Sequence, residues 1–198
     1  MKRIITALLI GLSTLGITME YSHLLSNELQ NSVYRLHVIA NSDESYDQEL
    51  KLKVRDRVIR AMDNLTDGDD TLEEAKNLSS DNLTYLCSEA IKEVRNNGYE
   101  YPVTIKTGRF PFPTKQYGNI SLPKGKYEGL KISIGSGKGQ NWWCVLYPNL
   151  CFVDGVVKMP KDSTEKLKGS MSKEAYSVVK NNATPKYKLK FKVLELFD

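Results

Sequence analysis

The chain has 198 residues, with 28 Lys and Arg against 24 Asp and Glu, so its formal net charge is +4 with histidines neutral. Hydrophobic residues are 40% and charged residues 26% of the chain, which excludes a disordered or collagen-like protein. The small positive charge does not indicate nucleic-acid binding, and two histidines and three cysteines leave little room for a His-rich metal site or a disulfide-dense miniprotein.

The first twenty residues predict export. Lys2 and Arg3 precede the run Ile4 to Met19, which carries no charge. This run suits a secretory signal and is slightly short for a bilayer span of about 20 residues. Because no A-x-A cleavage site follows, a cleaved signal and a retained anchor both stay open for residues 1–20. The two basic residues should remain cytoplasmic, so the rest of the chain is expected outside. Residues 21–33 are polar and predict a linker.

The next residues predict a strand and two amphipathic helices. Val33 to Ala40 alternates, with Arg35 and His37 on one face and Leu36 and Val38 on the other. Ser45 with Gln48, and Thr71 with Glu74, have the spacing of capping boxes at two helix starts, and Asn97-Gly98 ends the second helix. The apolar stripes of the two helices are Leu50, Val54, Val58, Met62 and Leu65, then Leu72, Ala75, Leu78, Leu83, Leu86, Ala90, Ile91 and Val94.

From Tyr99 onward the pattern predicts strands. Two prolines exclude Phe110 to Pro113 from a central strand, because proline lacks the amide donor. Gly135 to Gly139 predicts a loop. The other expected strands are 103–107, 119–122, 127–134, and a last hairpin of 142–146 and 150–153.

The tail, residues 158–198, is basic, with ten Lys against five Asp and Glu. It predicts a weak helix near Ser172 to Val179 and a strand at Lys186 to Val193 with one lysine face. A solvated edge-strand face is the interpretation of those lysines, with a membrane or nucleic-acid patch as the alternative.

The last hairpin places Cys144 opposite Cys151, where directly opposed strand residues come close enough for a disulfide. An exported chain can keep such a bond, whereas a thiol-redox site would need C-x-x-C. Cys87 is interpreted as a small buried hydrophobe. Trp142 and Trp143 should point to opposite faces, one into the core and one to the surface, where it could anchor a contact.

No catalytic, metal or cofactor site emerges from the motifs. The loop G-S-G-K-G matches neither phosphate-binding fingerprint and precedes a strand, so nucleotide binding is disfavoured. His37 and Asp43 could belong to a hydrolytic triad, but the G-x-S-x-G elbow is missing, and a histidine within a strand is more simply structural.

Three blocks carry a family resemblance. They are RLHVIANSD (Arg35 to Asp43) running into LKLKVRD (Leu50 to Asp56), then FPTK with YGN (Phe112 to Asn119), then NWWCV with LCF (Asn141 to Phe152). In this order, behind an export signal, the chain resembles stage II sporulation protein R of endospore-forming bacteria. The resemblance covers about Tyr34 to Asp154, plus a terminal KFKVLEL.

The resemblance implies a protein made in the forespore and exported into the space between the forespore and mother-cell membranes. There it would activate a membrane-embedded aspartic protease of the mother cell, which cleaves the sigma-E precursor. The implied role is a signalling ligand and not an enzyme, without cofactor, small-molecule substrate or nucleic acid, and with membrane contact only through the N-terminal segment. The expected contact residues are Arg35, His37, Asn41 and Asp43 at the exit of the first strand, with Trp142 and Trp143.

Two other functions stay open. An exported hydrolase or cell-wall-active enzyme would require His37, Asp43, Asp56 and Lys115 to converge in a cleft. A ligand-binding module would use the glycine loop.

The fold class predicted is α+β, a single domain over residues 34–157. In it one N-terminal strand leads into two helices, which pack on a mostly antiparallel sheet. The tail joins the same domain through the terminal strand.

Overall fold

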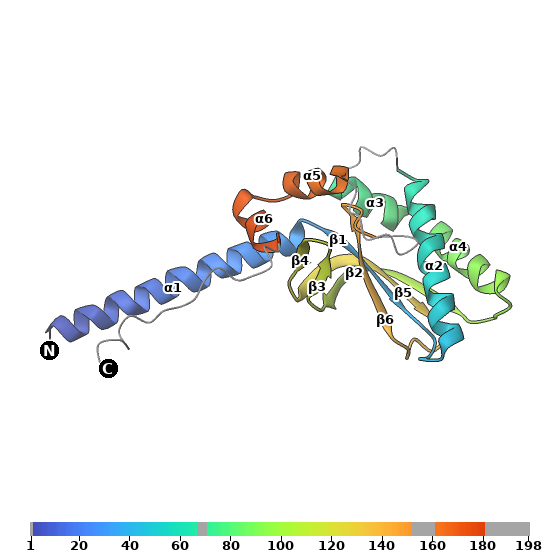
Figure 1. The fold of residues 1–198 in the computed structure, drawn as a ribbon, viewed down its shortest axis with the longest axis horizontal. Helices are drawn as coiled ribbons and strands as arrows, with labels where there is room; N and C mark the ends of the chain where they lie inside the picture. The colour runs from blue at the N-terminus through green and yellow to red at the C-terminus, as the bar shows by residue number, and fades with distance from the viewer. Residues whose placement is uncertain (1, 67–70, 152–160, 181–198) are drawn as a thin grey trace.

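The computed structural model describes residues 2–66, 71–151 and 161–180, and it confirms the α+β class. Figure 1 shows one long helix projecting from a body built of a sheet with helices against it. The elements in chain order are α1 (Lys2–Asn31), β1 (Tyr34–Ile39), α2 (Ser45–Asp63), α3 (Leu72–Asp81), α4 (Leu83–Asn96), β2 (Val103–Phe112), β3 (Lys115–Tyr117), β4 (Ile120–Leu122), β5 (Gly125–Ile134), β6 (Asn141–Tyr147), α5 (Lys161–Gly169) and α6 (Lys173–Val179).

Helix α1 corrects the predicted linker. It runs without a break from Lys2 to Asn31, so residues 21–31 are helical. By length and composition it could cross a membrane, although a signal sequence passes the same test. Leu29 is buried in the body, whereas Leu24 is exposed. The apolar segment therefore continues directly into a helix end that belongs to the fold.

The main sheet is mixed. Its order is β2-β5-β1-β6, and β1 pairs parallel with β5 but antiparallel with β6. The expectation of a mostly antiparallel sheet is met in two of its three pairings, β1–β6 and β2–β5. Strand β2 lies at an edge, which explains how it includes Pro111. The remaining strands, β3 and β4, form a separate two-stranded sheet.

Two hydrophobic cores lie on the two faces of β1, as its alternation predicts. Leu36 and Val38 point into the larger core, which α2 and α4 cover. The smaller core lies on the other face at one end of the sheet, under β3, β4, α6 and the end of α1. Both faces of β1 are consequently buried.

The helices differ from the prediction in two details. The expected second helix is two helices, because the chain breaks at Asn82 between α3 and α4. The capping box of Thr71 and Glu74 is confirmed, whereas the one expected at Ser45 is wrong: Glu44 is the N-cap of α2 and makes no side-chain cap. The weak helix after Ser172 is confirmed as α6.

The last hairpin is confirmed only in its first strand. Leu150 and Cys151 follow β6 as non-strand residues, although the Leu150 amide donates to the Val145 carbonyl at 3.1 Å. The rest of the expected return strand and the terminal strand at residues 186–193 lie outside the described residues.

Candidate functional site

Asn41 joins the exit of β1 to the glycine loop. Its side-chain oxygen accepts from the Ser136 amide at 2.9 Å, and its backbone carbonyl accepts from the Ser136 hydroxyl at 2.6 Å. Its amide nitrogen donates to the buried carboxylate of Asp47 at 2.8 Å. Asn41 is therefore committed to holding two segments together.

Asp43 makes a second bridge between the same segments. Its carboxylate accepts from the Gln140 amide at 2.7 Å while its side chain stays on the surface. The Ser42 hydroxyl, between the two bridging residues, donates to Asp47 at 2.6 Å. The strand exit is thus a hydrogen-bonded corner centred on Asp47, which the sequence analysis did not single out.

The glycines of the loop are explained by this corner. A Cβ on Gly139 would lie 2.1 Å from the Ser42 carbonyl oxygen, and one on Gly135 would lie 2.2 Å from the Asn41 side-chain oxygen. Gly135 also has φ +57°, a conformation that favours glycine. The glycines let the loop approach the strand exit closely, which accounts for them without a phosphate ligand.

Arg35 is fully buried, so it cannot touch a partner directly. Its guanidinium carbon lies 4.2 Å from the ring centroid of Phe112 and 4.7 Å from that of Tyr127. One terminal nitrogen donates to the Tyr117 hydroxyl at 2.9 Å, and the other two side-chain nitrogens have no hydrogen-bond partner. Burial raises the pKa of Tyr117, and the Arg35 charge opposes that rise.

His37 lies beside Arg35 on the same face of β1 and is 6% exposed. Its ring stacks on Trp143 with centroids 3.7 Å apart, and Nε2 lies 2.6 Å from the Asn141 side-chain oxygen. Burial lowers the pKa of His37; the Asn141 hydrogen bond opposes this shift and the charge of Lys131 adds to it. A stacked and hydrogen-bonded imidazole is a structural group, as its place in a strand suggests.

The two tryptophans face opposite cores, and both are half-buried, which corrects the expectation of one buried and one exposed ring. Trp142 lies under the guanidinium of Arg55 at 4.3 Å. Both line a groove of about 290 Å³ between β3 and β6. Its other lining residues are Lys115, Gln116, Tyr117, Gly118 and Asn141.

The disulfide between Cys144 and Cys151 is confirmed, with Cα atoms 5.4 Å apart. It fastens the segment after the turn to the end of β6. Cys87 is a free, half-buried cysteine. Burial raises the pKa of its thiol, which agrees with an unreactive residue.

Three of the four groups that an enzyme would need have separate partners. His37 contacts Asn141, Asp43 holds the Gln140 amide, and Asp56 pairs with Arg55 at 2.5 Å. Of the four, Lys115 alone lines the groove beside Trp143. Within the described ranges there is also no group of three or more His, Cys, Asp or Glu placed to hold a metal.

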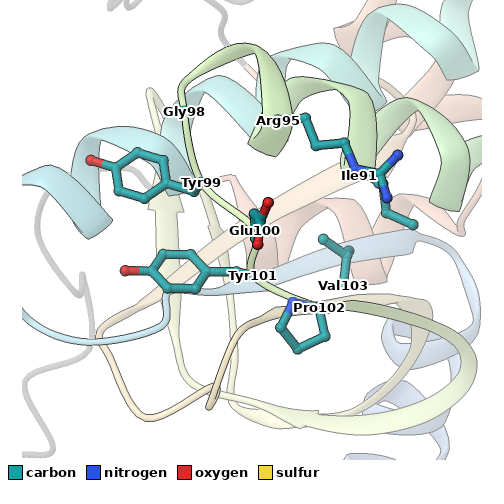
Figure 2. A pocket seen from close by; sticks show the side chains of 8 residues that line it. All are labelled: Ile91, Arg95, Gly98, Tyr99, Glu100, Tyr101, Pro102 and Val103. Atoms are coloured by element: carbon teal, nitrogen blue, oxygen red, sulfur yellow. The ribbon is translucent and has the colours of Figure 1, made fainter.

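A larger cavity, of about 670 Å³, contains none of the candidate residues. It lies between the end of α4 and the segment leading into β2, and Figure 2 shows the rings of Tyr99 and Tyr101 side by side at its rim. Their centroids are 5.3 Å apart. Figure 2 also shows Ile91 and Arg95 of α4 across from them.

Comparison with known proteins assigns the family. Residues 30–157 match the family described as stage II sporulation protein R (spore_II_R). A stretch of 126 residues is 36% identical to stage II sporulation protein R of Bacillus subtilis (strain 168), covering 64% of this chain and 56% of that relative. No solved structure matches.

The chain belongs to the stage II sporulation protein R family.

The region shared with the sporulation protein R family runs from the end of α1 past the disulfide, so it includes every described strand and the larger core. The smaller core also takes Leu29 of α1 and side chains of α5 and α6, which lie outside the matched residues. The matched stretch spans little more than half the length of the B. subtilis relative. The apolar part of α1 precedes the matched residues.

In this family member the six expected contact residues do not form a contact surface. Arg35 and His37 are buried, Asn41 and Asp43 hold the corner, and Trp143 stacks on His37. The surface residues beside them, Lys106, Lys131 and Lys115, were not expected as contacts. Lys106 and Lys131 lie in predicted strands, where alternation places each lysine on the polar face. Alternation does not predict which strands are neighbours, so it could not show that the two lysines lie together.

Proposed function

We propose that this chain is an exported sporulation signal that activates a membrane-embedded aspartic protease of the mother cell and so leads to cleavage of the sigma-E precursor. The observation that supports this proposal is the family match, which includes all described strands of the sheet. The apolar helix α1 is compatible with export, either as a signal or as an anchor. The proposed location is the space between the forespore and mother-cell membranes.

The internal structure supports a recognition role more than a reaction. The polar side chains near the strand exit have structural partners, so they hold a surface in shape. A ligand activates an enzyme only if it binds the active state more tightly than the inactive one. A difference of about 1–3 kcal/mol would change the protease equilibrium about 5- to 150-fold.

The test is reconstitution in a host that does not sporulate. The precursor and the protease are expressed with and without this chain, and precursor cleavage is followed on a gel. We expect cleavage only when the chain is present and exported. A variant without residues 2–20 should fail, and an unrelated signal sequence fused in their place should restore cleavage.

Two outcomes would count against the proposal. Cleavage by the unexported variant would contradict action on the outer face of the protease. No cleavage with a folded, exported chain would contradict the activator function and favour the exported hydrolase.

A further inference from the structure

One face of the main sheet carries cations without anions. Residues two apart in a strand share a face, so the register between strands defines rows across the sheet. The face away from α2 and α4 contains no Asp or Glu in its rows. From β2 across to β6 the central row is Lys106, Lys131, His37 and Trp143.

Two lysines of this row lie directly opposite each other. Lys106 is exposed and pairs in register with the half-buried Lys131. Like charges at such positions destabilise a sheet. Neither lysine has a carboxylate partner among residues 2–66, 71–151 and 161–180. Lys131 instead lies over the ring of Phe110, 5.7 Å from its centroid.

Arg35 adds a buried positive charge beneath the same face. It belongs to the row next to that of His37, and its guanidinium has aromatic neighbours and the Tyr117 hydroxyl but no carboxylate among its contacts. A buried cation that is not neutralised is costly, and its field is poorly screened by water. The face therefore retains unneutralised charge at a cost to stability.

The groove between β3 and β6 adjoins this row through Trp143 and adds a third lysine, Lys115. We name Lys106, Lys131, Lys115 and Trp143 together the basic face. None of the exposed large hydrophobic side chains in the described part of the chain belongs to the strands of this face: they lie on α1 and at Tyr46, Tyr85 and Val178.

We propose that the basic face binds an acidic, extended segment of the partner protein. This inference rests on the proposed function, because it names the chemistry of the activated partner's contact. Charge complementarity selects an acidic occupant. A row that begins with two lysines and ends at Trp143, whose groove holds the third lysine, suits a chain that lies across the strands. The residues from Lys158 to Asp198 carry a net +5 (ten Lys minus five Asp and Glu), so they are not the complementary occupant.

Recognition should use side chains and not strand addition to β6. The Trp143 carbonyl accepts from the Tyr117 hydroxyl at 3.3 Å, and the Val145 carbonyl accepts from the Leu150 amide at 3.1 Å. These contacts occupy two acceptors that an added strand would need. In the next row of the face Thr104 lies opposite Ser133, and both are polar.

The test compares two double variants of the full chain. Lys106→Glu with Lys131→Glu reverses the basic face, whereas Arg60→Glu with Arg95→Glu makes the same change in net charge on exposed residues of α2 and α4. In the reconstituted cleavage assay we expect the first variant to lose at least about tenfold in rate and the second to match the wild type. Circular dichroism and melting confirm that both variants fold.

A second measurement separates this inference from the proposed function. Polyglutamate is titrated into the full chain in neutral detergent micelles, and tryptophan fluorescence is recorded. Binding should weaken with salt and fall at least about tenfold in the Lys106 and Lys131 variant alone.

Together, the two measurements test the activator function and the binding of an acidic segment separately. If the wild type does not trigger cleavage but binds polyglutamate through the basic face, the protease function fails and the acidic-ligand chemistry stands. If the reversed variant triggers cleavage at the wild-type rate, the inference is wrong and the function stands. A wild type that ignores polyglutamate but responds to phosphatidylglycerol through the two lysines would make the face a lipid contact, which also overturns the inference.

Discussion

At the scale of single residues, the environment of each polar side chain decides whether it can contact a partner. Arg35 and His37 are close in sequence to the exposed Asp43, yet burial withdraws both from the surface. Both supply shape beneath the basic face, and Arg35 also supplies a buried positive charge. Because burial changes the pKa of His37 on folding, the stability of the protein also depends on pH.

The stability of the protein should decrease as the pH falls below about 6.5, the usual histidine pKa. Burial lowers the pKa of His37 in the folded state, so the unfolded chain takes up a proton first and is favoured in acid. The stability is fully present above the unfolded pKa and is lost as the pH falls from there toward the folded pKa. Each unit of difference between the two pKa values corresponds to about 1.4 kcal/mol.

Denaturant unfolding at a series of pH values between 7.5 and 5, chosen to bracket that usual pKa of about 6.5, checks this. His37→Gln keeps a donor for Asn141 and should reduce the slope. His23→Gln, on the exposed part of α1, should leave the slope unchanged. An equal slope in the wild type and the His37 variant would show that this histidine does not control the effect.

At the scale of elements, the close approach of the glycine loop to the end of β1 holds the strand exit in place. Gly139→Ala should destabilise the protein by about 1–3 kcal/mol, because its methyl group would meet the Ser42 backbone at 2.1 Å. Gly169→Ala is the matched control. Its methyl group meets no atom within 4 Å, so the change should be neutral or slightly stabilising. Thermal melting of the two variants measures the difference, and equal melting temperatures would refute the close approach.

At the scale of the whole molecule, α1 is continuous with the domain and not joined to it by a linker. Leu29 is 2% exposed, and the Glu28 carboxylate accepts from the Ser172 hydroxyl at 2.9 Å, beside the start of α6. The Gln30 side chain accepts from the Lys126 amide at 2.9 Å, next to the start of β5. If α1 is retained as an anchor, these contacts fix the direction in which the domain leaves the membrane.

Substitution within α1 tests this coupling. Leu29→Ala should destabilise the domain by about 2–5 kcal/mol, because it leaves a cavity in the smaller core. Leu24→Ala removes an exposed leucine one and a half turns earlier and should change stability by less than about 0.5 kcal/mol. Denaturant unfolding of the full chain in detergent gives both values. Equal effects would mean that the helix end does not belong to the fold.

The sequence alone predicted the structural features that depend on residues close together in the chain. The α+β class, β1, the start of α3 and α6 follow from alternation, amphipathic stripes and capping pairs, which act over a few residues. The disulfide was also predictable, because Cys144 and Cys151 are separated by a single turn. The family is carried by three short blocks, and the comparisons confirm it.

The tertiary structure decided what depends on residues far apart in the chain. Parallel pairing of β1 with β5 brings His37 beside Lys131, which is 94 positions away, and no local pattern encodes that neighbour. The burial of Arg35 follows from Phe112, Tyr117 and Tyr127 closing over it, although alternation only placed it on a face. The alternation of side chains along a strand determines which residues share a face, whereas long-range packing determines which face meets solvent. The lysines of the basic face come from different strands, so only the order of the strands in the sheet brings them together.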